Sequence, residues 1–381
     1  MKNSINLILF FAEDPGAVNY LAPLASHLIA IGKNILLLSS GHATSLLKKR
    51  GLEPVEVNNS DHAVSLYTSS EADLLLVGTS ENLDSPGLAL IAHAKKAGHA
   101  SVGLVDYFAN AGFRFRGNTV KPLAYAPDWL VVPDSWTAKE YEDLGFDKNK
   151  IVIAGHPQYD LVLQQKNEFD RDGRCEIRKR ILPENAQGKT IIVFVSELST
   201  GLDSLQYQYS KEYTLNGRGQ SKYRTDIVME EFLDAISGIC NNDKDRPFLI
   251  LRLHPKDSIQ NQEKYINEFD LVSQGGEPLE VLYTSDLVVG MSSMLLLEAY
   301  LLSLNVLSIV PRSKEREWLP ITRMNSIPCV THKIGIDKYF SDFFSTSFNN
   351  SGPVVEGHSE NADIVEGAIN RCVYFFDSLM A

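Results

Sequence analysis

The chain has 381 residues, of which 44% are hydrophobic and 22% are charged, as expected for an ordinary folded protein of about two domains. Lysine and arginine number 36 against 48 aspartate and glutamate, and the resulting net charge of −12 excludes a bulk nucleic-acid binder. The four cysteines, Cys175, Cys240, Cys329 and Cys372, are far apart and form no CxxC pair, which argues against a zinc site and indicates a reducing compartment.

Neither end of the chain nor its interior shows a membrane-spanning pattern. The apolar run 5–11 is too short for a signal peptide and lacks a small-residue cleavage site. The longest apolar candidate, 295–310, is interrupted by Glu298, Ser303 and Asn305. We therefore predict a cytoplasmic protein, whose only membrane association is peripheral and at the inner face.

The first half of the chain alternates short apolar runs with helical patterns. Continuous runs of valine, isoleucine and leucine joined by helices predict βαβ units and a parallel sheet covered on both faces. The functional edge of such a sheet lies at the carboxyl ends of its strands. The predicted strands are 5–11, 34–39, 73–78, 101–105, 129–132 and 151–154, and the predicted helices are 17–31, 42–50, 86–96 and 137–144.

A second alternation of the same kind follows the polar stretch 164–174, which we predict to be a linker. The fold class is therefore α/β, with two Rossmann-like domains that face a cleft. We predict an N-terminal domain at 1–165, a C-terminal domain at 166–360, and a helix in 361–381 that crosses back to the first domain. In the second half the predicted strands are 190–195, 248–253, 287–289 and 305–310, and the predicted helices are 225–239, 259–269, 292–304 and 362–379.

The stretch 285–304 has the pattern of an anion site. A short strand passes through Gly290 into Ser292 and Ser293, and a largely apolar helix follows. The unpaired N–H groups of a helix start bind phosphate, and serine hydroxyls add donors, although a serine at this place is equally suited to a plain helix cap. Glu298 stands in the apolar part of the helix, where a carboxylate needs a partner or a ligand hydroxyl.

A second motif in the same half is Arg252-Leu253-His254-Pro255-Lys256 at the end of a predicted strand. Alternation along the strand predicts that Arg252 and His254 share a face. His254 and Lys256 at that edge are suited to hydrogen-bonding a phosphate, although a histidine is often a satisfied core residue. Glu197, after the strand 190–195, is a further candidate for donor binding at this edge.

Two loops of the first half carry candidates for catalysis and acceptor binding. Glu13 and Asp14 follow the first strand, and either carboxylate can act as a general base, although Asp14 before Pro15 is also a plain helix cap. Gly16 permits close approach of a ligand to the backbone, and we predict that it binds the donor. The acceptor candidates in the second loop, which can equally cover the edge of the sheet, are Asp106, Arg114 and Arg116.

The polar segment 200–225 leaves the carboxyl end of a predicted strand and contains four tyrosines among basic residues. A connection of this length inside a domain is usually functional or disordered. We interpret it as a loop that binds the acceptor or closes over the cleft, with a mobile surface insertion as the equal alternative.

These motifs resemble those of GT-B glycosyltransferases, in particular bacterial capsule and surface-polysaccharide transferases, and more distantly UDP-N-acetylglucosamine 2-epimerases. The resemblance rests on His254-Pro255, Ser292-Ser293 and Glu298. It implies that His254 and the two serines contact the donor phosphates and that Glu298 bonds a ribose hydroxyl. Glu13-Asp14-Pro15-Gly16 is similar to the acidic pair of those transferases, with an inserted proline.

The resemblance favours transfer over epimerisation because Ser196-Glu197-Leu198 stands where the epimerases carry a Thr-His-Arg-Arg-Glu type motif. We therefore predict a glycosyltransferase that moves a sugar from a nucleotide or phosphate donor to a glycan or lipid-linked acceptor. In that function Asp14 or Glu13 would be the base, and His254 would stabilise the leaving phosphate. No metal or other cofactor is expected. The alternatives are a 2-epimerase and a non-catalytic sugar-nucleotide-binding protein.

Overall fold

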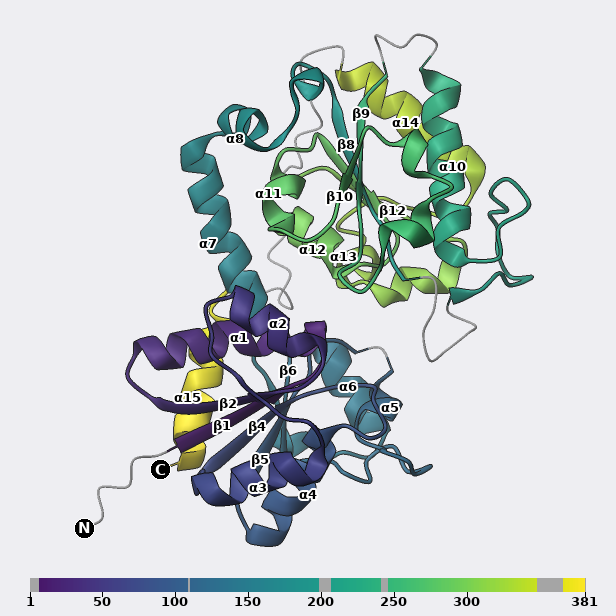
Figure 1. Cartoon of the computed structure of the whole chain (residues 1–381). Coiled ribbons are helices and arrows are strands. Elements are labelled where there is room, and N and C mark those ends of the chain that lie inside the picture. Colours follow the sequence, from purple (N-terminus) through teal and green to yellow (C-terminus); the bar gives the residue numbers. More distant parts are fainter. Residues whose placement is uncertain (1–6, 109, 199–206, 241–245, 348–365, 381) are drawn as a thin grey trace. The chain divides into compact units, whose positions relative to one another are not determined.

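The computed structural model describes residues 7–108, 110–198, 207–240, 246–347 and 366–380. The chain divides into two compact units, one formed by Met1–Leu161 with Ser359–Ala381 and the other by Val162–His358 (Figure 1). Each unit is built on a parallel sheet, of seven strands in the first and six in the second. The predicted α/β class with two Rossmann-like, GT-B-like halves is confirmed.

The sheet of the first unit has the strand order β3-β2-β1-β4-β5-β6-β7, and all neighbouring strands are parallel. Its central strands are apolar and buried on both faces, as a sheet covered by helices requires. The strands are β1 (Leu7–Ala12), β2 (Asn34–Ser39), β3 (Val55–Glu56), β4 (Leu74–Gly78), β5 (Ala100–Leu104), β6 (Trp129–Val132) and β7 (Ile151–Ile153).

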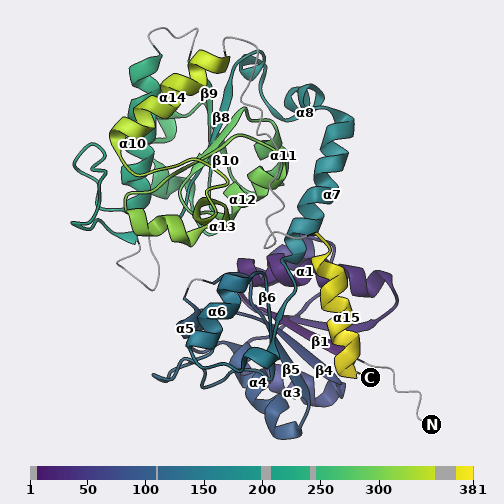
Figure 2. The ribbon, with the colours of Figure 1, turned by 180° about the vertical axis from the view of Figure 1, so that it is seen from behind.

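Helices cover both faces of this sheet because successive strand residues point to opposite sides (Figures 1 and 2). Ile8 and Phe10 pack with α1 (Pro15–Ala30), α2 (His42–Lys49) and α15 (Ala368–Met380). Leu9 and Phe11 pack with α3 (Ser60–Ser70), α4 (Pro86–Ala97) and α6 (Ser135–Asp143). The short elements are α5 (Ala111–Arg114) and η1 (Lys148–Lys150).

The C-terminal helix α15 belongs to the first unit, although it is far in sequence from the rest of that unit. Asp160 accepts hydrogen bonds from the backbone N–H groups of Gly367 and Ile369, at 2.8 and 2.9 Å. Cys372 and Phe376 are buried against α1. The N-terminal part of the predicted helix 362–379 lies outside the described residues.

The sheet of the second unit has the order β10-β9-β8-β11-β12-β13 and is also parallel throughout. Alternate residues of β8, such as Ile192 and Phe194, belong to a core that α10 and α14 close on one face. The strands are β8 (Ile191–Val195), β9 (Phe248–Arg252), β10 (Leu271–Ser273), β11 (Leu287–Gly290), β12 (Val306–Ile309) and β13 (Cys329–Val330).

The helices of the second unit follow from the same alternation of strands and apolar helical patterns. The α-helices are α7 (Pro157–Asp172), which begins in the first unit, α8 (Arg174–Ile181), α10 (Arg224–Ile239), α11 (Pro278–Tyr283), α12 (Met294–Leu301), α13 (Pro320–Arg323) and α14 (Lys333–Ser347). The 3₁₀ helices are η2 (Glu184–Ala186), η3 (Ile259–Gln262), η4 (Ile266–Glu268) and η5 (Ser313–Trp318).

The predicted linker 164–174 is helical, because α7 continues through it to Asp172 and only Gly173, at φ +82°, separates α7 from α8. The division between the two units falls shortly before it, after Leu161. Glutamine, lysine, glutamate and arginine are good helix formers, so polarity alone did not indicate a break. The predicted helix at 259–269 is two 3₁₀ turns, η3 and η4.

His156, in the turn between β7 and α7, makes the stability of the first unit depend on pH. Its ring stacks on Tyr159 with centroids 4.8 Å apart, and its Nδ1 accepts the N–H of Gln158 at 3.2 Å. Burial lowers the pKa of His156 to about 4, although the Asp106 carboxylate opposes the shift. Folding therefore favours the neutral ring, and the unfolded chain takes up the proton first as the pH falls.

We expect this histidine to add about 3 kcal/mol to stability above pH 6.5 and to lose that contribution progressively between about pH 6.5 and pH 4. A His156→Gln variant should show a shallower fall of melting temperature with acidification. The exposed His42→Gln variant is the matched control and should follow the unmodified protein. An unchanged slope in His156→Gln would show that this ring does not control acid stability.

Candidate functional site

The strand order of the second sheet reverses at β8, because the chain continues from β8 to β9 on one side and later adds β11 on the other. In open α/β sheets a ligand crevice forms at such a point, outside the carboxyl ends of the strands. The loop after β8 carries Ser196 and Glu197, and the loop after β11 carries Ser292 and Ser293. The candidate donor site is therefore this edge of the second unit.

Glu197 connects the two loops directly. Its carboxylate accepts the backbone N–H of Ser292 at 2.5 Å and the Ser292 hydroxyl at 3.2 and 3.3 Å. Ser293 is the N-cap of α12, and its Oγ accepts the N–H of Leu295 at 3.3 Å. Ser292, the residue before the N-cap of α12, thus binds an anion, and in this structure that anion is a carboxylate of the same chain.

Arg224, the first residue of α10, completes the cluster and was not among the predicted site residues. Its side chain is 2% exposed and reaches Glu197 and Glu315 at 2.6 Å each, and Ser292 Oγ at 3.1 Å. Burial alone would lower its pKa, but Glu197 and Glu315 raise it above the ordinary value. Arg224 is therefore a permanent cation with two carboxylate partners.

Aromatic rings and a second arginine enclose this cation. Arg312 donates to Glu315, and the indole ring of Trp318 lies 5.2 Å from the Arg224 guanidinium and 5.4 Å from that of Arg312. Tyr213 covers Arg312 at 5.1 Å. We call Glu197, Arg224, Ser292, Arg312 and Glu315 the switch-point cluster. Such a buried network holds its members in fixed positions.

His254 follows β9, beside the loop after β8. Its backbone N–H lies 3.3 Å from Ser196 Oγ, and its Nδ1 accepts the N–H of Lys256 at 3.1 Å. Because Nδ1 is an acceptor, the neutral ring carries its proton on Nε2. Burial lowers the pKa of His254, against the opposing field of Glu197, so the ring is neutral at pH 7 and offers Nε2–H as a donor.

The other predicted donor residues lie on the same elements. Arg252 donates to Ser273 Oγ at 2.9 Å and to the carbonyl of Gly275, so its described contacts lie at β10. The Lys256 side chain is exposed, and Glu298 is 5% exposed in the middle of α12. Contacts of Arg252, Lys256 and Glu298 with a nucleotide remain predictions.

The first unit repeats the arrangement, because its strand order reverses at β1 and β4 is the next strand on the other side. Glu13, after β1, accepts the Asn82 side-chain amide of the loop after β4 at 2.7 Å. Asp14 occupies the N-cap of α1 with Pro15 at the first helical position, as predicted, but accepts no capping bond from the helix. Its role as a base remains a prediction.

The predicted acceptor residues are only partly brought together. Asp106 Oδ1 accepts from Arg114 at 2.6 Å and from Thr79 at 3.2 Å, and Arg114 is buried. Gly16 makes room for Asp106, because a Cβ at Gly16 would lie 1.8 Å from Asp106 Oδ2. Arg116 instead stacks on Phe113, at 4.3 Å from the ring centroid. Acceptor binding by these residues remains a prediction.

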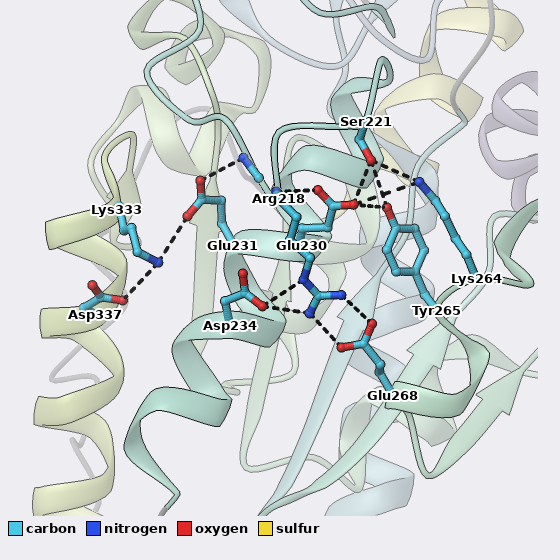
Figure 3. A network of polar contacts seen from close by, with 11 residues as sticks. Arg218, Ser221, Glu230, Glu231, Asp234, Lys264, Tyr265, Glu268, Lys333 and Asp337 are labelled. Carbon is cyan, nitrogen blue, oxygen red and sulfur yellow. Dashed lines mark hydrogen bonds and ion pairs between the residues drawn. The ribbon is translucent and has the colours of Figure 1, made fainter.

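The described part of the polar segment, 207–223, is tied to α10. Glu230 accepts the backbone N–H of Arg218 at 2.8 Å and the hydroxyls of Ser221 and Tyr265 at 2.7 Å each (Figure 3). Glu231 accepts the N–H of Gly217 at 2.9 Å. These contacts argue against a mobile insertion for this part of the segment, while 200–206 lies outside the described residues.

We expect Glu230→Ala to release the segment, because three donors then lose a charged acceptor, and a bond to a charged group is worth about 1.5–3 kcal/mol. Amide hydrogen exchange at 208–222 should accelerate at least about tenfold. Lys333→Ala is the control, since its exposed amine is 3.5 Å from Glu231 and such surface pairs contribute little. Equal exchange rates in the two variants would contradict the anchoring of the segment by Glu230.

Two further findings bear on the kind of site. The described residues contain no group of three or more histidine, cysteine, aspartate or glutamate side chains that could hold a metal ion. None of the helices in the described ranges combines the length and the apolar character that a membrane span requires.

No family model matches the chain, and no curated protein matches it in sequence. Solved structures match its fold. The UDP-GlcNAc 2-epimerase of Methanocaldococcus jannaschii is 12% identical with a TM-score of 0.65, over 98% of this chain and 99% of that one. Anabaena HepE in complex with UDP and glucose is 11% identical with a TM-score of 0.63, over 98% and 99%.

The wall teichoic acid polymerase TagF is 14% identical with a TM-score of 0.59, over 99% of this chain and 88% of that one. The similarities span both units and define the two-domain GT-B class of fold. At these identities they show the fold alone and do not separate epimerases from transferases.

The sequence patterns proposed Glu197, His254, Ser292 and Ser293, which lie at this edge of the sheet and whose roles remain predictions. They did not indicate Glu315 or Trp318, and Arg224 entered only as one basic residue of the polar segment 200–225. These three residues lie at helix starts or in a short 3₁₀ turn, where the local sequence gives no functional signal. The residues that were proposed from the sequence share a different signal, because they follow strands or begin helices at the carboxyl edge of the sheet.

Proposed function

We propose that this protein is a glycosyltransferase that binds a nucleotide-activated or phosphate-activated sugar at the switch-point cluster of its second unit. The acceptor is a glycan, free or lipid-linked, of surface-polysaccharide synthesis at the inner face of the membrane. The observation that carries the proposal is the anion bound in the loop directly before α12. There the N–H of Ser292 and the guanidinium of Arg224 already hold a carboxylate.

A phosphate oxygen accepts hydrogen bonds as that carboxylate does. A phosphate at this place would accept a further hydrogen bond from His254. The neutral ring of His254, with its proton on Nε2, is suited to hydrogen-bond a departing diphosphate without a change of charge. Glu298, further along α12, would bond a ribose hydroxyl. Together these groups would stabilise the leaving group as the bond between the sugar and the phosphate breaks.

The acceptor hydroxyl requires a base, and the proposal assigns that role to Asp14, with Glu13 beside it. In an inverting transfer, the acceptor oxygen forms the new bond to the anomeric carbon while the phosphate oxygen leaves with the bonding electrons. The acceptor proton passes to the carboxylate.

A nucleotide titration with a charge reversal tests the donor site. Ser293→Asp keeps a good N-cap but places a carboxylate where the donor phosphate is proposed, whereas Ser293→Asn keeps the cap without the charge. In calorimetry against CMP, UDP, CDP, GDP, dTDP and phosphoribosyl diphosphate, we expect one ligand to bind the unmodified protein. Its affinity should fall at least about tenfold in Ser293→Asp and much less in Ser293→Asn.

Absence of binding by every compound in the panel, or equal affinity in both Ser293 variants, would overturn the donor site. The fold of the M. jannaschii epimerase makes sugar-nucleotide epimerisation the second candidate function. Binding without any turnover would identify the third, a non-catalytic sugar-nucleotide-binding protein.

A further inference from the structure

The first unit contains a pocket of about 460 Å³ at the carboxyl edge of its sheet, within the range of about 300–1,000 Å³ typical of small-molecule sites. The loops after four adjacent parallel strands, β1 to β4, build its wall. The lining residues are Glu13, Ser40, Gly41, Asn58, Asn59, Ser60, Asp61, Asn82, Asp84 and Pro86.

The lining of this pocket is polar but carries no cation. It combines the three carboxylates Glu13, Asp61 and Asp84 with amides and hydroxyls, and none of its ten residues is lysine, arginine or histidine. A phosphate, sulfate or uronate would meet only like charges there. The lining therefore disfavours an anionic ligand and suits one that offers many hydroxyl groups.

Two of the lining residues each carry an oxygen atom that has no hydrogen-bond partner in the described part of the chain. Ser40 is 9% exposed, and its Oγ has no partner within the described residues. The same holds for Glu13 Oε2, although Oε1 of that carboxylate accepts from Asn82. Buried polar atoms are nearly always paired in native proteins, so each unpaired atom requires an explanation. A ligand hydroxyl can meet both needs, because it donates to a carboxylate and accepts from a serine.

Gly41 sets the path of the loop after β2 along this wall. Its backbone, at φ +57° and ψ −135°, lies in a region that only glycine adopts readily. A Cβ at this position would lie 4.0 Å from the carbonyl oxygen of Glu13. The backbone conformation therefore requires the glycine, whereas the space beside it would admit a Cβ.

We propose that this pocket binds an uncharged sugar unit through its hydroxyl groups, with Glu13 Oε2 and Ser40 Oγ as two of its contacts. The identification of that sugar as the acceptor rests on the proposed transferase function, whereas the binding itself does not. The carboxylate of Glu13 then lies beside a sugar hydroxyl, and the pocket selects a neutral acceptor over a phosphorylated or acidic one.

Saturation-transfer NMR and calorimetry on the full chain test the proposal. The probes are methyl glycosides of glucose, galactose, mannose and N-acetylglucosamine, with methyl glucuronide and glucose 6-phosphate as the anionic counterparts. We expect at least one neutral glycoside to bind with a millimolar Kd, and the anionic probes to bind at least about tenfold more weakly.

Ser40→Ala should lower the affinity for the neutral probe about five- to tenfold, and Glu13→Gln should lower it by at least as much. Each substitution removes a hydrogen bond to a ligand hydroxyl. Ser45→Ala, which removes an exposed hydroxyl of α2 outside the pocket, is the control and should keep the affinity. Melting curves of all variants check folding.

Preference for an anionic probe, binding of no neutral glycoside, or undiminished affinity in both pocket variants would overturn the proposal. Nucleotide titration of the same protein separates this failure from that of the transferase function. A neutral sugar that binds to a protein without nucleotide affinity would support the pocket and reject the transferase.

Discussion

Replacing Arg224 with methionine is expected to lower the free energy of unfolding of the second unit by about 3–5 kcal/mol. The guanidinium is the shared partner of Glu197 and Glu315, and Glu315 is fully buried. Methionine fills a similar length but leaves both carboxylates without their cation. Breaking a buried ion pair in this way costs much more than the intact pair contributes.

The matched control is Arg218→Met, which removes an arginine of the same unit with two carboxylate partners, Asp234 and Glu268. That side chain is 38% exposed, so solvent can replace its contacts and the loss should stay near 1 kcal/mol. Urea titration read by pulsed hydrogen exchange in peptides of β8 and α10 reports the second unit separately from the first. Similar losses in the two variants would show that the cluster around Arg224 does not support the fold as described.

Adding Glu197→Gln and Glu315→Gln to Arg224→Met should recover part of the lost stability, because the unpaired charges are then gone. Nucleotide affinity should not recover with it, since the proposed phosphate partner is still missing. Recovery of both quantities would argue that Arg224 acts only on the fold.

The second large effect concerns His254. We expect His254→Ala to reduce turnover of an identified donor and acceptor by about 10²–10³, the loss typical when one preorganised donor to a developing negative charge is removed. The change should appear mainly in kcat, because the hydrogen bond strengthens as the phosphate leaves. The exposed His332→Ala of the same unit is the control and should stay within about twofold.

The lowered pKa of His254 gives this prediction a pH signature. Because burial lowers the pKa of His254 below its ordinary value, the ring is already neutral at pH 7 and loses no charge as the pH rises from 7 to 8. The activity of the unmodified protein should therefore not decline in this pH range because of His254. The pH profile of His254→Asn should have the same shape there. A descending limb that depends on His254 would mean that the charged ring is the active form, and turnover within threefold of the unmodified protein would remove His254 from the mechanism.

The central strands of both sheets were predictable from the sequence because they are buried on both faces and read as unbroken apolar runs. The strands β10 and β13, at the edges of the second sheet, are two or three residues long and only partly buried, and they were not predicted. The helix through 164–174 was not predicted, because a polar segment reads as a linker although its good helix formers continue α7 without a proline or glycine before Gly173. At 259–269 the side chain of Asp257 accepts from Ser258 N–H, Asn261 and Gln262, which favours 3₁₀ turns over a regular helix.

Some residues of the candidate site were also predictable from the sequence, and others were not. Ser292, Ser293 and His254 were predictable, because their residue types stand at strand ends and helix starts in patterns that fit phosphate binding. Arg224 and Glu315 are 91 residues apart in sequence and meet only through the order of strands in the sheet. A pattern within one segment carries no information about such a pair.

The most direct test follows the fate of the sugar. The full chain would be incubated with the nucleotide sugar chosen by titration and with the neutral glycoside that binds the first unit, and followed by ³¹P and ¹H NMR. We predict that free nucleotide and a new glycosidic bond appear in equal amounts. Conversion of the sugar at C2 while it stays attached to the nucleotide, with no nucleotide released, would contradict the account and identify an epimerase.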